Sequence, residues 1–88
     1  MKTILVTGTS SGIGNQICIQ AAAMNFRVIS VSRNIEPLKD LGGIESFKLD
    51  ITDKDSLDDF VTNLKNRKIK IDILINNAGY LVSELFSE

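Results

Sequence analysis

Residues 3–24 read TILVTGTSSGIGNQICIQAAAM, and this stretch decides how the chain begins to fold. Residues 3–7 are a short apolar run that ends at a glycine, which is typical of a buried β-strand. Residues 12–24 carry apolar side chains at helical spacing, with Ile13, Ile17, Ala21 and Met24 on one stripe and Cys18 and Ala22 beside it. The sequence therefore predicts a strand, a glycine-rich turn and a helix.

Strand and helix signals then alternate through the middle of the chain. Asn25 favours the left-handed conformation that ends a helix, and the β-branched run at residues 27–32 predicts a second strand. Residues 34–43 fit a short helix with Asn34 as its cap. Residues 44–49 alternate apolar and polar side chains, and their charges are those that protect an edge strand from unwanted pairing.

A second amphipathic helix and a last strand follow. Thr52 and Asp55 have the spacing of a capping box, and the apolar stripe behind them consists of Leu57, Phe60, Val61 and Leu64. Residues 71–76, IDILIN, are almost continuously apolar, which predicts a strand buried on both faces, with Ile71, Ile73 and Ile75 on one face and Leu74 on the other. The predicted order β-α-β-α-β-α-β favours an α/β fold with a parallel sheet, right-handed crossovers and helices on both faces. No linker interrupts residues 1–88, so we expect a single domain.

Composition narrows the classes of partner. A net charge of −1 without any block of like charge argues against nucleic acid and against an acidic membrane surface. No apolar run is long enough to span a membrane, and a single cysteine cannot form an internal disulfide. The absence of histidine removes the usual nitrogen ligands of zinc, so we expect no metal site. A cytoplasmic protein is the simplest expectation.

The glycine-rich turn predicts a phosphate site. A strand that enters a helix through such a turn directs unpaired N–H groups and the positive end of the helix dipole to one point. The spacing here is G-x-x-x-G-x-G, which differs from both G-x-G-x-x-G and the lysine-containing phosphate loop. Taken alone, the motif is equally compatible with a turn that has only a structural role.

Four features together resemble the short-chain dehydrogenase/reductase family. Residues 7–14, TGTSSGIG, match the family pattern T-G-x-x-x-G-I-G, Asp50 follows the third predicted strand, and NNAG at 76–79 follows the fourth. The order of the elements also matches. The resemblance covers nearly the whole chain and implies a Rossmann-type doubly wound sheet of about four strands in the order 3-2-1-4.

This resemblance implies roles for particular residues. The turn residues that would meet the cofactor pyrophosphate and adenosine ribose are Gly8, Ser10, Ser11, Gly12, Ile13 and Gly14. Asp50 would accept a hydrogen bond from the adenine amino group, and the N–H of Ile51 would meet a ring nitrogen. Asn76 would tie the central strands together, while Asn77, Ala78 and Gly79 would pass beneath the riboses. Without the resemblance, Asp50 could be a helix-entry carboxylate and residues 76–79 a strand-ending turn.

Cofactor choice depends on the end of the second predicted strand. Enzymes of this fold that prefer NAD place an acid there, whereas an arginine accommodates the 2′-phosphate of NADP. Here Ser32 stands where the acid is expected and Arg33 follows. The residues favour NADP, with NAD as the alternative because Ser11 lacks the second basic charge of many NADP-preferring relatives. Alternatively, Arg33 is an exposed surface arginine that binds no ligand.

No catalytic residue can be assigned in these 88 residues. The family uses a serine, a tyrosine and a lysine four residues after the tyrosine, but Tyr80 is followed by glutamate at position 84. Ser83 and Ser87 also precede the region of the catalytic serine. We therefore expect a partial NAD(P)-binding domain of a longer oxidoreductase that transfers hydride between nicotinamide and a carbonyl or alcohol, inactive alone. The alternative is a non-catalytic nucleotide-binding or self-assembling fragment.

The strand at 71–76 predicts self-association. In the family strand order it is an outer strand, although its composition is that of an interior one. An apolar edge without a central lysine or proline is a template for pairing with another chain. We expect a homo-oligomer in which two copies of this strand pair antiparallel around a two-fold axis.

Overall fold

The computed structural model describes residues 1–9, 12–38, 41–50 and 52–76. The elements in chain order are β1 (Thr3–Thr7), α1 (Gly12–Ala23), β2 (Arg27–Ser32), the 3-10 turn η1 (Glu36–Leu38), β3 (Ile44–Lys48), α2 (Lys54–Asn66) and β4 (Ile73–Asn76). The strands form a four-stranded parallel sheet in the order β3-β2-β1-β4. The predicted fold class and strand order are confirmed.

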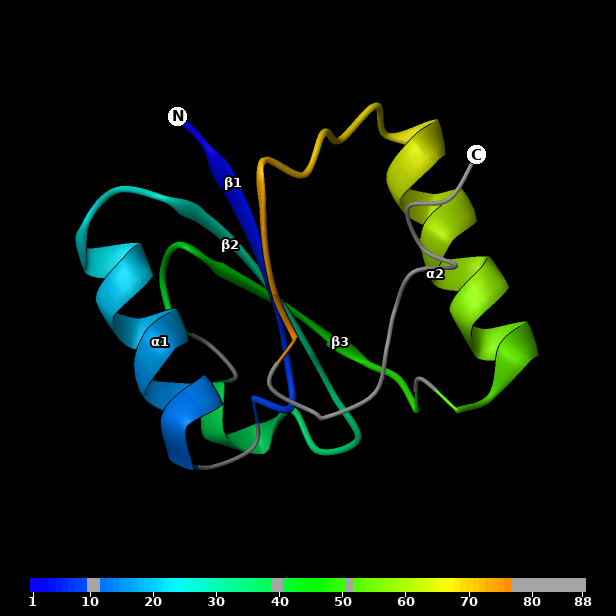
Figure 1. Ribbon diagram of the computed structural model, residues 1–88, viewed down its shortest axis with the longest axis horizontal. Coiled ribbons are helices and arrows are strands. Elements are labelled where there is room, and N and C mark those ends of the chain that lie inside the picture. Colours follow the sequence, from blue (N-terminus) through cyan, green and yellow to red (C-terminus); the bar gives the residue numbers. More distant parts are fainter. Residues whose placement is uncertain (10–11, 39–40, 51, 77–88) are drawn as a thin grey trace.

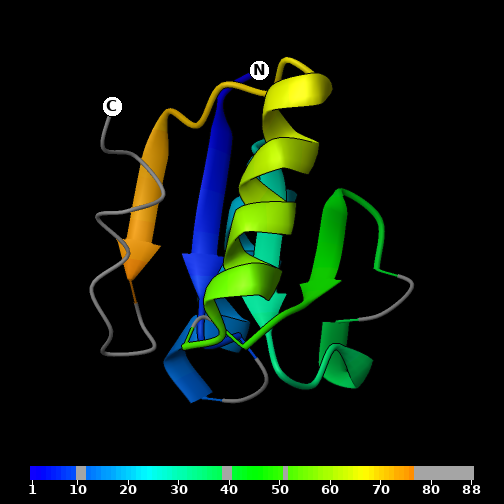
Figure 2. The ribbon, with the colours of Figure 1, turned by 90° about the vertical axis from the view of Figure 1, so that its right-hand side faces the viewer.

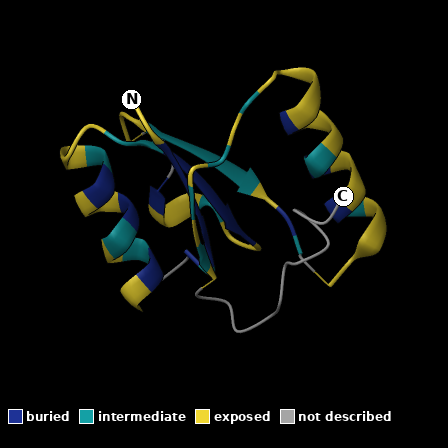
Figure 3. Ribbon diagram, turned by 45° about the horizontal axis from the view of Figure 1, so that its top comes forward, coloured by how far each residue is buried: buried dark blue, intermediate teal, exposed yellow. Residues whose placement is uncertain are grey.

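The two helices cover opposite faces of the sheet, as Figures 1 and 2 show. The α2 face holds one apolar cluster, centred on Leu5, Ile29, Phe60 and Leu64. The α1 face holds a second cluster, which includes Val6, Cys18, Val28 and Leu38. Strands β1 and β2 contribute to both clusters because successive side chains point to opposite faces. They are almost entirely buried, whereas the outer sides of the helices are exposed (Figure 3).

The predicted buried stripe of α1 is correct in its middle, where Ala21 is buried and Ile17 is partly buried, and wrong at both ends. Ile13 and Met24 are 71% and 70% exposed, while Gly14, Cys18 and Ala21 form the buried face. These small side chains are spaced i, i+4 and i+7, so they share a face. Burial of this face among small residues brings the helix backbone close to the sheet and turns the larger side chains of Ile13 and Met24 toward solvent.

The end of α1 follows the sequence prediction. Asn25 has a φ of +68°, and the N–H of Phe26 donates to the carbonyl oxygen of Ala21 at 3.1 Å. Phe26 is half-buried against the α1-face cluster. This is the left-handed termination with an apolar contact beyond it, and it sends the chain directly into β2.

The predicted helix at 34–43 is confined, within its described residues, to η1. Asn34 does cap it, because its Oδ1 accepts from the N–H of Glu36 at 3.1 Å. Leu38 anchors the turn in the α1-face cluster with 2% of its surface exposed. Gly43, at a φ of +82°, leads into β3.

The start of α2 also differs from the prediction. Its N-cap is Asp53, whose Oδ1 accepts from the N–H groups of Asp55 and Ser56 at 3.1 and 3.3 Å. Thr52 is instead bound to Asp50 and is not the cap. The predicted apolar stripe is correct: Leu57, Phe60 and Leu64 are buried, and Val61 packs partly buried beside them.

Strand β4 is shorter and less buried than its composition predicts. It begins at Ile73, and Leu74 is 37% exposed. Ile71 was expected to share a face with Ile73 and Ile75, but it packs on the α2 face and they pack on the α1 face. The chain enters the strand at Asp72, which exchanges two hydrogen bonds with Thr3: its Oδ2 accepts from the Thr3 N–H, and its N–H donates to the Thr3 carbonyl oxygen, both at 2.9 Å.

An ion pair fastens the end of α2 to the outer strand β3. Arg67 makes a two-pronged contact with Glu45, with Nη1–Oε2 at 2.6 Å and Nη2–Oε1 at 3.0 Å, and Arg27 lies 3.9 Å from the same carboxylate. The hydrogen bond from Arg67 is the main reason why the pKa of Glu45 lies below its ordinary value near 4.5.

This pair predicts a specific pH dependence. Because the folded-state pKa of Glu45 is lowered, its contribution to stability is present at neutral pH and is lost as the pH falls below about 4.5 toward the folded-state pKa. Glu45→Gln should therefore reduce stability slightly at pH 7 and flatten the dependence of stability on pH between about 5 and 3. Urea unfolding at a series of pH values tests this. A Glu45→Gln protein with an unchanged acid slope would contradict the assignment.

Candidate functional site

The predicted site residues that the structure describes gather at the carboxyl edge of the sheet. All four strands run in the same direction, so the segments after β1, β2 and β3 emerge on one side, next to the beginning of α1 (Figure 2). These segments carry Gly8 and Gly12, Arg33, and Asp50. In open parallel sheets, ligands bind outside this edge.

The glycine-rich turn has the backbone geometry that requires glycine at two positions. Gly8 and Gly12 have φ values of +66° and +65°, in the left-handed region where a side chain is strained. The N–H of Gly8 donates to the carbonyl oxygen of Val31 at 3.0 Å, which fixes the start of the turn to β2. Among the described residues, a Cβ on Gly12 would meet no atom within 4 Å. The glycine therefore serves the backbone conformation and leaves open space beside the start of α1.

The remaining described residues of the turn secure its position. Gly14 lies on the buried face of α1, and the exposed side chain of Ile13 points away from the core. Thr9 is 2% exposed, and its carbonyl oxygen accepts a long bond of 3.5 Å from Asn15 Nδ2. Sequence reasoning missed Thr9 and Asn15, because nothing in the motif distinguishes the residue that will be buried from those that face outward.

Asp50 is held as an ionised acceptor at the end of β3. Its Oδ1 accepts from both the N–H and the Oγ1 of Thr52, at 2.9 and 2.6 Å. These two bonds are the main causes of its lowered pKa, and the positive charge of Arg33 adds to them. A carboxylate that is ionised at neutral pH can only accept hydrogen bonds, and Oδ2 takes no part in the contact with Thr52.

Thr52 is a further positioning residue that sequence reasoning did not find. The signal was present, because an aspartate followed two residues later by a hydrogen-bonding residue is the pattern of an Asx turn. It was instead interpreted as the start of a capping box.

The end of β2 presents Arg33 to solvent beside this carboxylate. Ser32 is 7% exposed, and its Oγ accepts from the N–H of Asn34 at 3.2 Å. The hydroxyl that replaces the expected acid is thus part of a local turn, and the next residue, Arg33, is exposed. The structure brings Arg33 near enough to Asp50 for its charge to lower the carboxyl pKa.

Asn76 closes the site on the other side. Its Oδ1 accepts from the Thr7 Oγ1 at 3.1 Å, which links the carboxyl ends of β4 and β1. The tie between strands that the sequence resemblance implied is therefore observed. The other implied contacts at Ser10, Ser11, Ile51, Asn77, Ala78 and Gly79 fall outside the described residues, as do Tyr80, Ser83 and Ser87.

Two negative findings apply to the described part of the chain. Residues 1–9, 12–38, 41–50 and 52–76 contain no group of three or more side chains that could hold a metal ion. Neither helix within these ranges is both long and apolar enough to cross a membrane.

Comparison with known proteins identifies the family. The sequence profile of the short chain dehydrogenase family matches residues 2–88. The chain belongs to this family. The 3beta-hydroxysteroid dehydrogenase of Mediterraneibacter gnavus is 35% identical over 86 residues, which are 89% of this chain and 31% of that protein.

Solved structures of short-chain dehydrogenases have the same fold. A 4-hydroxyisoleucine dehydrogenase complexed with NADH superposes with a TM-score of 0.83 at 28% identity, covering 91% of this chain and 35% of that one. A metagenomic short-chain oxidoreductase in complex with NADP gives a TM-score of 0.77 at 31% identity, covering 90% and 39%. The chain thus spans roughly a third of the length of its relatives. These two structures carry different nicotinamide cofactors.

Proposed function

We propose that this chain is the cofactor-binding part of an NADP-dependent oxidoreductase, one that transfers hydride between nicotinamide and a carbonyl or alcohol. The observation that carries the proposal is the placement of the open glycine turn, the ionised Asp50 and the exposed Arg33 at one edge of a parallel sheet. NAD is the alternative cofactor, because family members bind either one.

Each group has a chemical role in this proposal. The turn around Gly12 and the start of α1 receive the pyrophosphate, since backbone N–H groups and the helix dipole favour an anion there. Asp50 accepts from the adenine amino group, and Arg33 binds the 2′-phosphate as a donor with a permanent charge. The bound nicotinamide supplies the hydride chemistry, and residues outside these 88 supply the catalytic serine, tyrosine and lysine. A cytoplasmic location belongs to the same proposal and is supported by a single, buried cysteine.

A pair of glycine variants tests the nucleotide site. Gly12→Ala places a side chain where φ is +65°, whereas Gly42→Ala adds the same methyl group at a position without positive φ. At both positions the described residues leave the space within 4 Å open. We expect Gly12→Ala to weaken binding of 2′-phospho-AMP at least about fivefold and to reduce stability by about 1 kcal/mol. Gly42→Ala should leave both unchanged. Calorimetric titration and urea unfolding measure the two effects, and an unmodified chain that binds no nucleotide would overturn the proposal.

Self-association through β4 is the second part of the proposal. The N–H of Asp72 points to β1, so by alternation Leu74 also directs its backbone groups to β1, and Ile73 and Ile75 direct theirs outward. Asp72 binds Thr3 and therefore does not obstruct the outer side. Two copies paired antiparallel could exchange four main-chain hydrogen bonds through Ile73 and Ile75, with Leu74 opposite its own copy on the axis.

A charge at the axis should separate such a dimer. Leu74→Lys places two like charges directly opposite each other, which destabilises a strand pair. Ile13→Lys is the control, because it introduces the same charge at an exposed apolar residue of α1. We expect sedimentation at micromolar concentration to show a dimer for the original chain and the control, and a monomer for Leu74→Lys. A monomeric original chain would exclude this mode of assembly.

The second candidate function is that of a nucleotide-binding module that catalyses no reaction. It would use the same nucleotide site without chemistry. A longer natural protein that carries a serine and a Tyr-x-x-x-Lys pair after these residues would favour the enzyme, and nucleotide binding without any such partner sequence would favour the module.

A further inference from the structure

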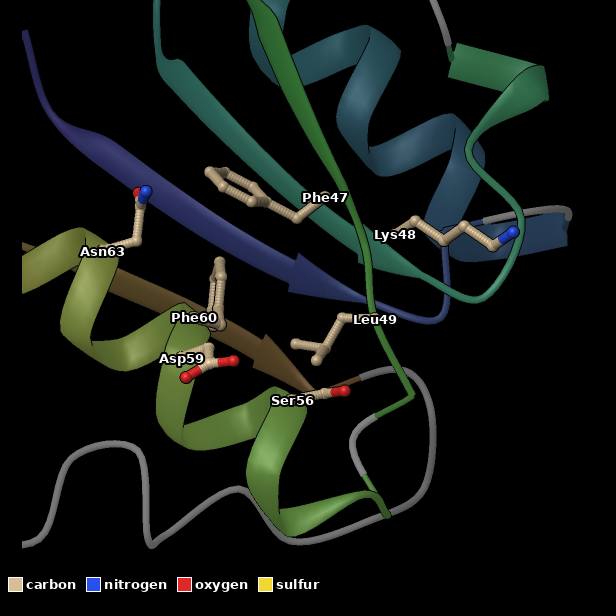
Figure 4. Close-up of a pocket in the computed structure, with 7 residues that line it drawn as sticks. All are labelled: Phe47, Lys48, Leu49, Ser56, Asp59, Phe60 and Asn63. Atoms are coloured by element: carbon tan, nitrogen blue, oxygen red, sulfur yellow. The ribbon is translucent and has the colours of Figure 1, made fainter.

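The outer strand β3 borders a hollow that the nucleotide site does not use. It is about 310 Å³ in size and lies between β3 and α2. Figure 4 shows Phe47 and Leu49 from the β3 side and Phe60 from α2 turned toward one another, while the side chain of Lys48 points away. The rings of Phe47 and Phe60 meet edge to face with centroids 4.9 Å apart. The floor of the hollow is thus apolar and fixed by packing.

The volume sets the kind of group that fits. Sites for drug-sized molecules start at about 300 Å³ and bury most of the ligand, whereas this hollow is at that lower limit and open. One aliphatic side chain fits into such a space, whereas a whole dinucleotide cofactor does not. Ser56, Asp59 and Asn63 form the polar wall on α2, spaced i, i+3 and i+7 along one side of the helix.

The backbone of β3 offers hydrogen bonds next to this hollow. The carbonyl oxygen of Gly43 accepts from Val28, and the N–H of Leu49 donates to Ser32, so the odd-numbered residues of the strand face β2. By alternation, Ser46 and Lys48 direct their backbone groups outward. Among the described strands β3 is outermost on this side of the sheet. The Ser46 side chain is turned back toward the sheet, where its hydroxyl binds that of Ser30 at 2.9 Å.

The charges beside this edge select the partner. Asp59 lines the hollow, and Asp55 lies one turn earlier on the same helix side. The sequence predicted that the two charged residues of β3 would protect this edge from pairing, but Glu45 is bound by Arg67 and Lys48 points away from the hollow. The α2 side of the hollow therefore carries carboxylates, while the ammonium group of Lys48 is turned away from it, and this arrangement favours a basic segment.

We propose that β3 accepts an extended basic segment of a partner protein as an added parallel or antiparallel strand. Main-chain hydrogen bonds from Ser46 and Lys48 hold the segment, and one aliphatic side chain enters the hollow above Phe47 and Phe60. A lysine or arginine two positions away, on the same face of the added strand, meets Asp59. Main-chain bonds supply affinity and alternate side chains supply specificity, as in other cases of strand addition.

A designed peptide is the probe. The acetylated and amidated heptapeptide Thr-Lys-Thr-Leu-Thr-Lys-Thr places leucine between two lysines on one face of a strand, and its control replaces both lysines with glutamate. We expect amide shifts at Ser46, Lys48 and Asp59 when the labelled chain is titrated with the lysine peptide. The glutamate peptide should bind more weakly. Equal binding of the two peptides, or shifts confined to β4, would overturn the proposal.

Protein variants test separately the contribution of the Asp59 charge and that of the main-chain groups of β3. Asp59→Asn should weaken binding of the lysine peptide about 1.5- to 5-fold, the range of an exposed ion pair. Asp58→Asn removes the same charge from a residue that does not line the hollow and pairs with Lys54 at 3.9 Å, so it should have a smaller effect. Lys48→Pro removes an outward N–H and should abolish binding, whereas Lys48→Ala should retain it.

A modified peptide tests whether main-chain hydrogen bonds to β3 are required, without altering the protein. N-methylation of the leucine and its two neighbouring threonines removes main-chain donors on both edges of the peptide, and we expect binding to be lost. Retained binding of the methylated peptide would show that only side chains are recognised and would overturn strand addition. Binding by Lys48→Pro equal to that of Lys48→Ala would do the same.

Discussion

Ile29→Ala should lower the free energy of unfolding by about 3 kcal/mol, whereas Ile13→Ala should change it by less than about 0.5 kcal/mol. Ile29 is fully buried in β2, which pairs with β1 on one side and β3 on the other. Its side chain belongs to the cluster beneath α2, so truncation removes apolar contact and leaves a cavity. Ile13 is 71% exposed on α1.

The expected loss at Ile29 is large for a chain of this size. The free energy of unfolding of an 88-residue domain is about 4 to 13 kcal/mol. A loss of about 3 kcal/mol is therefore a large part of the total stability. With a urea slope of about 1.5 kcal/mol per molar, the midpoint should fall by about 2 M. Circular dichroism during urea titration measures both variants against the original chain. Equal losses at Ile29 and Ile13 would show that the exposed side of α1 is covered in solution.

The contrast between the two helices shows what periodicity can predict. In α2 the large apolar residues Leu57, Phe60 and Leu64 stand among acids and amides, so the pattern identified the buried face correctly. In α1 apolar residues occur on several sides, and the pattern gave weight to their size. Packing against the sheet kept Cys18 and Ala21 from the predicted set and added Gly14, because small side chains allow a close approach. The large side chains of Ile13 and Met24 were left exposed.

In the site, too, local sequence patterns could be predicted, whereas contacts that depend on packing between segments could not. Residues adjacent in sequence, such as those of the glycine turn, could be predicted together because one turn positions them. The order of the strands and the positive φ of Asn25 followed from family pattern and local chemistry, and both are confirmed. The bonds of Thr52 to Asp50 could not be chosen over a helix cap from spacing alone. The approach of Arg33 to Asp50 depends on the register between β2 and β3, which a single sequence does not contain.

That approach makes Arg33 the residue whose replacement should change ligand preference most. We expect the original chain to bind 2′-phospho-AMP about ten- to a hundredfold more tightly than AMP, the range of hydrogen bonds to a charged group. Arg33→Asp should reverse the order, because a carboxylate repels the phosphate and accepts a bond from the free ribose 2′-OH. Calorimetric titration with both nucleotides gives the ratio directly.

The reversal distinguishes specific recognition from a general effect of charge. Lys2→Asp makes the same change in net charge at an exposed residue before β1, at the opposite edge of the sheet, and should leave the ratio unchanged. Arg33→Asp also removes a positive charge that lowers the pKa of Asp50, but the bonds from Thr52 are the larger causes, so Asp50 stays ionised at neutral pH and adenine recognition persists. AMP should therefore still bind to Arg33→Asp. If both nucleotides lose affinity equally, or the ratio is the same in all three proteins, Arg33 does not contact the 2′-phosphate and the preference for NADP has no basis in this residue.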